Sequence, residues 1–213
     1  MQQTLKTINM KKKYLYILAF VIIAILGYNS VYFKKLSDVK NANKENFDFK
    51  AYADSIYYKG ILKSKKTIAL TNLIASVKTN QDEAFKKYGN RLGIGNSAYF
   101  MIKSTGKIID IKDGIYTIAD EKNGVVYIDT KYIFGNALRD ASGLVKLTDF
   151  KTNAQFNKVS ESLNDIVRNE VVPKEIKKVK IGDSISFSGA IKLSKKQILF
   201  TDLLIIPSQI KLQ

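Results

Sequence analysis

The chain has 213 residues, with 35 Lys and Arg against 19 Asp and Glu, and it contains no His and no Cys. Without Cys there is no disulfide, thiol nucleophile or thiolate metal site, and without His there is no imidazole base or Ser-His-Asp triad. A content of 46% hydrophobic and 25% charged residues is typical of a globular domain. The sequence therefore predicts one folded domain with accessory segments.

The net charge of +16 raises the question of nucleic-acid binding, because clustered Lys and Arg release counterions from phosphates. Residues 1–40 contribute seven Lys and one Asp to this excess, and the remaining Lys are spread along the chain. Dispersed Lys more often form a solvated charged face. The charge by itself therefore does not favour a nucleic-acid partner.

A charge-free apolar run follows Lys11, Lys12 and Lys13 and extends from Tyr14 to Phe33. As one helix with a rise of ~1.5 Å per residue, such a run would span ~30 Å, the thickness of a bilayer core. A cleaved signal peptide has a similar pattern, but no small-x-small cleavage site follows the run. The sequence thus predicts an uncleaved transmembrane signal anchor.

The Lys residues before this run favour a cytoplasmic N-terminus by the positive-inside rule. The expected location is the inner (cytoplasmic) membrane, crossed once, with the C-terminal domain in the periplasm. The expected organisation is a cytoplasmic N-terminus over 1–13, a transmembrane anchor over 14–33, a linker over 34–46, a helical lead over 47–95 and an OB-like barrel over 96–213.

Helical spacing dominates the first part of the soluble region. Apolar residues repeat at helical intervals from Phe49 to Ile56, with Asp48 placed to cap the first turn and Gly60 to end it. The same spacing recurs over 70–77, and a further turn ends near Gly89. These segments predict short amphipathic helices that pack on a core.

From Asn96 the pattern changes to that of strands. Strands are predicted over 99–111, 115–119 and 125–130, because Asp113-Gly114 and Asn123-Gly124 favour tight hairpin turns. A capping-box pattern at 152–155 begins a helix, and two strands follow, the last over 197–206. Three strands, one helix and two strands is the order of an OB fold. The expected fold class is α+β, with a transmembrane helix, a helical lead and a five-stranded antiparallel barrel that has one helix between its third and fourth strands.

Four segments carry a resemblance to a known family: FDFKAYADSI at 47–56, YGNR at 88–91, GNALRD at 135–140 and DFKTNAQF at 149–156. The chain resembles the predicted periplasmic lipoproteins grouped as domain of unknown function 2291, over about 47–212. The resemblance implies an exported, membrane-tethered protein with an OB-like barrel, often encoded beside sugar-type ABC transporters and without an assigned activity. Family members often carry a lipidated Cys, which this chain lacks.

Candidate ligand-binding residues are Asn136, Arg139 and Asp140, which follow the third predicted strand. The planar guanidinium of Arg139 could clamp a carboxylate, a phosphate or a pair of sugar hydroxyls, and Asp140 could accept hydrogen bonds from hydroxyls. The alternative is a partly buried Arg and Asp pair that holds the loop over 131–150 against the barrel. The sequence leaves both interpretations open.

Arg91 is a further candidate, because it is one of three Arg in a chain that otherwise uses Lys. No cofactor or metal is expected, since the turn over 119–124 has too few carboxylates for Ca²⁺. No acid and base pair or activated nucleophile is recognisable, so the protein is not expected to be an enzyme.

Three functions from different classes fit these features. The first is a membrane-anchored binding or accessory protein for a small solute such as a sugar, or for a transporter component. The second is an envelope module that docks another protein without a small ligand. The third is an OB-type nucleic-acid binder, which would need exposed aromatic side chains such as Tyr116 and Tyr127 and which an extracytoplasmic location disfavours.

Overall fold

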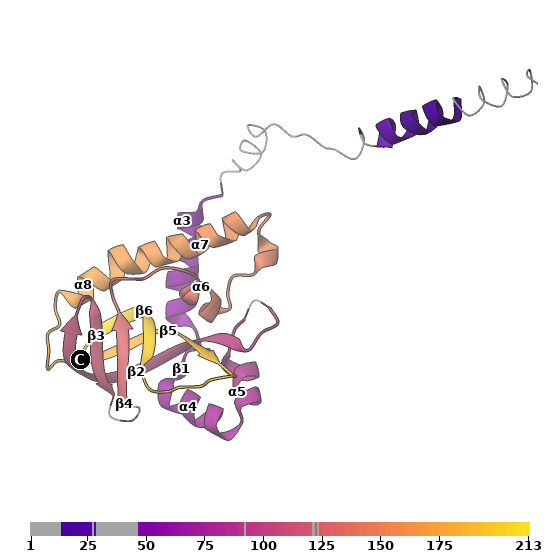
Figure 1. Ribbon diagram of the computed structural model, residues 1–213. Helices are drawn as coiled ribbons and strands as arrows, with labels where there is room; N and C mark the ends of the chain where they lie inside the picture. Colours follow the sequence, from indigo (N-terminus) through magenta and orange to yellow (C-terminus); the bar gives the residue numbers. More distant parts are fainter. Residues whose placement is uncertain (1–13, 27, 29–46, 92, 121, 123) are drawn as a thin grey trace, which may run out of the picture. The chain divides into compact units, whose positions relative to one another are not determined.

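The computed structural model describes residues 14–26, 28, 47–91, 93–120, 122 and 124–213 (Figure 1). By its internal contacts the chain divides into two compact units, Met1–Phe47 and Asp48–Gln213. The expected N-terminus over 1–13 and linker over 34–46 lie outside the described residues.

In the first unit, residues 14–26 and 28 are helical. Among the residues that the structure describes, no helix is long and apolar enough to cross a membrane. The expectation of a transmembrane helix over 14–33 is therefore wrong for this part of the chain, because a charge-free run measures apolar character and not the length of one helix.

The second unit begins with a helical segment of three parts: α3 (Phe49–Asp54), the π-helix η1 (Ser55–Gly60) and the 3-10 helix η2 (Ile61–Lys63). The Asp48 carboxylate accepts a hydrogen bond from the Ala51 backbone N–H at 2.9 Å, which confirms the predicted cap. The Tyr57 hydroxyl donates to the Ser208 carbonyl at 2.6 Å in the interior and so ties the segment to the last strand.

Two further helices follow the short strand β1 (Ile68–Ala69): α4 (Leu70–Thr79) and α5 (Gln81–Tyr88). The Asn80 side chain caps α5 by accepting from the Glu83 N–H. Leu70, Leu73 and Phe85 are buried in the same core as the barrel interior. The helices predicted here by apolar spacing are confirmed.

The sheet contains β1 and five longer strands: β2 (Ser97–Lys112), β3 (Ile115–Asp120), β4 (Gly124–Asp129), β5 (Ser184–Ser194) and β6 (Leu203–Leu212). The strand order is β1-β2-β3-β4-β6-β5, and an additional pairing between β2 and β5 closes the sheet on itself. The β1–β2 and β4–β6 pairs are parallel, and the other pairs are antiparallel. The expected five-stranded antiparallel barrel is therefore wrong, because the sheet has six strands and is mixed.

The predicted hairpin turn at 113–114 is confirmed, whereas the predicted bounds of the last strand are wrong. Asp113 and Gly114 have φ of 52° and 85°, and they connect β2 to β3 as predicted. The last strand lies later than the predicted 197–206. It continues through Pro207, which lies opposite Gly189 beside a shift in the strand register, and a bulge tolerates a residue without an N–H.

Between β4 and β5 the chain forms five helical elements instead of the one expected: α6 (Ala137–Ser142), η3 (Leu147–Asp149), α7 (Asn153–Asp165), the π-helix η4 (Ile166–Val171) and α8 (Val172–Ile176). The predicted cap of α7 is confirmed, since the Thr152 hydroxyl accepts from the Gln155 N–H at 3.2 Å. Figure 1 shows α7 crossing over the sheet with α6 beneath it, and α3 packs against α7.

The barrel interior, with α4 and α5, and the remaining helices have separate apolar cores. Phe100 and Ile102 of β2 point into the barrel, whereas Met101 between them joins a second core with α3, α6 and α7. Because successive side chains of a strand alternate between faces, β2 is buried on both sides at this point. The second core holds α6 and α7 in place and thereby positions the residues of the candidate site.

Candidate functional site

The structure brings together three of the four candidate residues. Asn136 is the N-cap residue of α6, and Arg139 and Asp140 lie within that helix. Arg91 lies elsewhere, is exposed and donates to the Gly95 carbonyl at 2.9 Å, so it is not part of this cluster.

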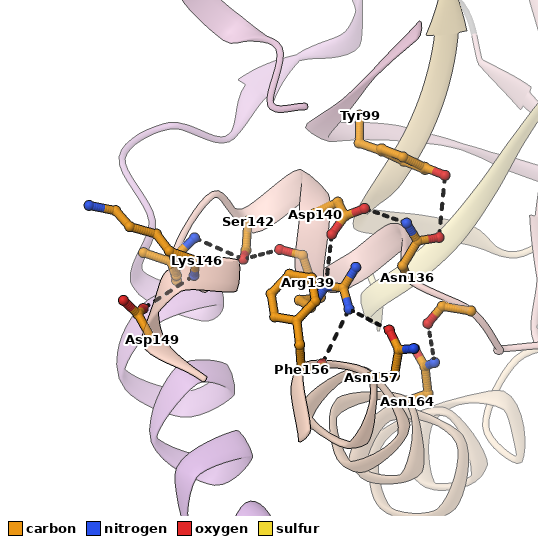
Figure 2. A network of polar contacts seen from close by, with 12 residues as sticks. Tyr99, Asn136, Arg139, Asp140, Ser142, Lys146, Asp149, Phe156, Asn157 and Asn164 are labelled. Carbon is orange, nitrogen blue, oxygen red and sulfur yellow. Dashed lines mark hydrogen bonds and ion pairs between the residues drawn. The ribbon is translucent and has the colours of Figure 1, made fainter. Parts of the chain in front are cut away.

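Arg139 and Asp140 form a buried ion pair (Figure 2). The two side chains are each 3% exposed, and Nε of Arg139 donates to the Asp140 carboxylate at 2.8 Å. The other carboxylate oxygen of Asp140 accepts from the Asn136 side-chain amide. Asn136 in turn accepts from the Tyr99 hydroxyl of β2 at 3.4 Å, so the network ties α6 to the barrel.

The same guanidinium connects α6 to α7. Nη1 of Arg139 donates to the Phe156 carbonyl at 3.2 Å and to the Asn157 side chain at 3.3 Å. The guanidinium also lies 3.6 Å from the centroid of the Phe156 ring, in a cation–π arrangement. These contacts hold α6 against α7.

A cavity of about 530 Å³ opens on the side of Arg139 that faces α7. We call it the α6–α7 pocket, and its lining residues are Phe134, Gly135, Asn136, Arg139, Asn157, Ser160, Glu161, Asn164 and Arg168. Most of them are polar, and those on α7 recur at helical spacing along one face. Of the predicted residues, Asn136 and Arg139 line the pocket, and Asp140 supports them from behind.

Two polar groups in the pocket have no partner. Ser160 is 6% exposed, and its buried Oγ makes no hydrogen bond. Nη2 of Arg139 has no partner either within the part of the chain that the structure describes. A buried polar atom without a partner, such as Ser160 Oγ, is uncommon and costly, and neither donor is satisfied by another described residue.

The charges around the pocket are largely paired. Arg139 pairs with Asp140, and Arg168 pairs with Asp165 while donating to the Ile133 carbonyl at 2.7 Å. The Arg168 guanidinium also stacks on Phe134, 4.5 Å from the ring centroid. The arrangement offers hydroxyl, amide and aromatic surfaces with little net charge, apart from the carboxylate of Glu161.

The sequence did not single out the α7 residues of the pocket. Ser160 and Asn164 lie beside the apolar face of an amphipathic helix, where polar residues usually meet solvent. Asn164 is instead 3% exposed and donates to the Gly135 carbonyl at 2.8 Å. Their burial depends on the loop before α6, which lies far from α7 in the chain, so no local signal could have found them.

The geometry also bears on the nucleic-acid alternative. Tyr116 is only 8% exposed and belongs to the barrel core, so it offers no stacking surface to a nucleobase. Within the described ranges, no group of three His, Cys, Asp or Glu could hold a metal ion.

Comparisons with known proteins agree on a family and a fold. A family model described as predicted periplasmic lipoprotein, domain of unknown function 2291, matches residues 21–211. The crystal structure of an OB-fold protein from Thermotoga maritima is similar, with 25% sequence identity and a TM-score of 0.68 over 78% of this chain and 99% of that one. No curated protein matches the chain.

Proposed function

Because this chain belongs to the predicted periplasmic lipoproteins of domain of unknown function 2291, we propose that it is a non-enzymatic binding protein of the cell envelope. The proposed ligand is a small hydroxyl-rich solute such as a sugar, held in the α6–α7 pocket. The description of the family supports an envelope location, and the resemblance noted from the sequence makes a sugar-type transporter component a further proposed partner.

The observation that carries the proposal is the buried, unpartnered Oγ of Ser160, a residue that lines the pocket. Together with Nη2 of Arg139 it can bind vicinal hydroxyls, and the Glu161 carboxylate can accept from others. A volume of about 530 Å³ lies within the ~300–1,000 Å³ of small-molecule sites. The paired charges favour a neutral ligand over a strongly anionic one.

The test is calorimetric and thermal-shift titration of the full-length chain with monosaccharides and sugar acids. A ligand at 100 times its Kd adds ~2.7 kcal/mol, which raises the unfolding midpoint by roughly 5–11 °C for a protein of this size. Failure of the whole panel to bind would contradict the proposal for this ligand class.

The decisive variant is Ser160→Ala, with Ser162→Ala as its matched control on the same helix outside the pocket. Losing one hydroxyl hydrogen bond should weaken sugar binding by roughly 2–12-fold. The unfolding midpoint should not fall, because the removed hydroxyl makes no bond within the protein. Equal weakening in both variants would place the ligand outside this pocket.

A further inference from the structure

A second hollow lies on the outer face of the barrel, on the strands β2, β5 and β6. It has a volume of about 530 Å³ and shares no residue with the α6–α7 pocket. Strand register explains its floor: Lys103 lies opposite Ser188, Thr105 opposite Ser186, and Ser186 opposite Lys211. These side chains share one face because the residues that alternate with them, such as Ile102, fill the barrel interior.

Separate elements form the walls of this hollow. Ile61 and Leu62 of η2 and Ala69 of β1 lie on one side, and Asp120 and Lys122 at the end of β3 lie on another. The hollow therefore depends on the parallel strand β1 and on the helical segment before it. We call it the lysine pocket.

Three lysines, Lys103, Lys122 and Lys211, line the lysine pocket. All three side chains are exposed, and none forms an ion pair with another described residue. The acidic residue of the lining, Asp120, is 6% exposed, and its carboxylate accepts from the Ser104 hydroxyl and from the Lys122 backbone N–H. The lysine pocket thus has an excess of positive charge, unlike the α6–α7 pocket.

Hydroxyl donors lie between the ammonium groups. Thr105 and Ser186 lie on the floor between Lys103 and Lys211, and Ser188 is hydrogen-bonded to Ser208 at 3.0 Å. A planar carboxylate presents its two oxygens in one plane, whereas a phosphate presents oxygens in several directions. Three ammonium groups from three different elements, with hydroxyls between them, match the second geometry.

We propose that the lysine pocket binds a phosphate group carried by a small organic phosphate or by a lipid headgroup. The volume leaves room for the group that bears the phosphate as well as for the phosphate itself. The proposal stands apart from the sugar-binding proposal, because the two pockets differ in residues, elements and charge.

The test titrates the full-length chain with glycerol 3-phosphate by calorimetry and measures its cosedimentation with phosphatidylcholine vesicles with and without phosphatidic acid. Lys103→Gln and Lys211→Gln remove two of the three ammonium groups. Lys107→Gln is the matched control, since it removes the same charge from the same face of β2 but does not line the pocket. The three substituted lysines are exposed, so the unfolding midpoints of the variants should stay unchanged.

We expect saturable binding that weakens about threefold to fivefold in each pocket variant, remains unchanged in Lys107→Gln and decreases with added salt. Binding to glycerol 3-phosphate would identify a soluble phosphate as the ligand, and binding only to phosphatidic acid vesicles would identify a lipid headgroup. The proposal is overturned if neither probe binds, or if Lys107→Gln weakens binding as much as Lys103→Gln does, because the general positive charge of the chain would then explain it.

Discussion

Replacing Arg139 with Ala should destabilise the fold, because Arg139 is the centre of the buried polar network. The substitution removes the ion pair with Asp140 at 2.8 Å and both Nη1 hydrogen bonds to α7. The Asp140 carboxylate would stay buried with only the Asn136 amide as a partner. Breaking a buried pair from one side costs ~3–5 kcal/mol, and the lower end applies here because Arg139 also borders a solvent-accessible pocket.

A loss of ~3 kcal/mol should lower the unfolding midpoint by roughly 6–12 °C. Urea unfolding of the full-length chain, followed by far-UV circular dichroism, measures the free energy directly, and a thermal melt measures the midpoint. Arg91→Ala is the control, because Arg91 is exposed and makes one hydrogen bond, so its loss should change stability by less than ~0.5 kcal/mol.

A double variant separates the cost of leaving Asp140 unpaired from the cost of removing side-chain volume. Arg139→Met combined with Asp140→Leu removes both charges and should recover most of the stability, since apolar replacements of a buried pair are often neutral. If the free energy of unfolding of Arg139→Ala lies within 1 kcal/mol of the wild-type value, then the network does not hold α6 to α7.

Two further predictions concern the interior. Burial raises the pKa of the Tyr57 phenol, whose hydroxyl donates to the Ser208 carbonyl. The Tyr57 phenol therefore keeps its proton in the folded state at pH values where the unfolded chain has lost it. Its contribution to the free energy of unfolding is complete below pH ~10 and declines as the pH rises above that value. Tyr57→Phe should cost ~1–3 kcal/mol at pH 7 by urea unfolding and should lose less additional stability above pH ~10 than the wild type does. Gly143→Ala should cost at least ~1–2 kcal/mol in the same assay, since Gly143 has a φ of 63° and an added Cβ would lie 2.5 Å from the Asn90 side chain.

The controls for these two variants come from the same chain. Tyr132→Phe alters an exposed tyrosine and should change the free energy of unfolding at pH 7 by less than ~0.5 kcal/mol. Gly93→Ala should be nearly neutral, because no atom of the described residues, apart from its chain neighbours, lies within 4 Å of the added Cβ. Parallel alkaline profiles for Tyr57→Phe and wild type, or a neutral Gly143→Ala, would contradict the corresponding prediction.

The sequence alone determined the features that depend on neighbouring residues. Asp113 and Gly114 tolerate positive φ, so they specified a hairpin turn, and Thr152 with Gln155 specified the start of α7. The four family segments were likewise sufficient to place the chain in its family, which the match over 21–211 confirms. Each of these signals lies within a few adjacent residues.

Only the tertiary structure decided which strands pair and in which direction. β1 is two residues long and pairs in parallel with the middle of β2, and β4 pairs in parallel with the distant β6. Alternating apolar residues show that a segment is a strand but do not identify its partner. For this reason a mixed six-stranded sheet appeared in the sequence as five antiparallel strands.

The candidate site divides in the same way. Arg139 and Asn136 could be singled out because their residue types are distinctive. The sequence does not show whether an Arg is exposed or buried, and the Arg139 side chain is only 3% exposed. Ser160 and Asn164 looked like solvent-facing residues of α7, and they became pocket residues only because α6 and the loop before it fold over them. Burial and the loss of partners are properties of packing between distant segments, so they emerge only when the fold is complete.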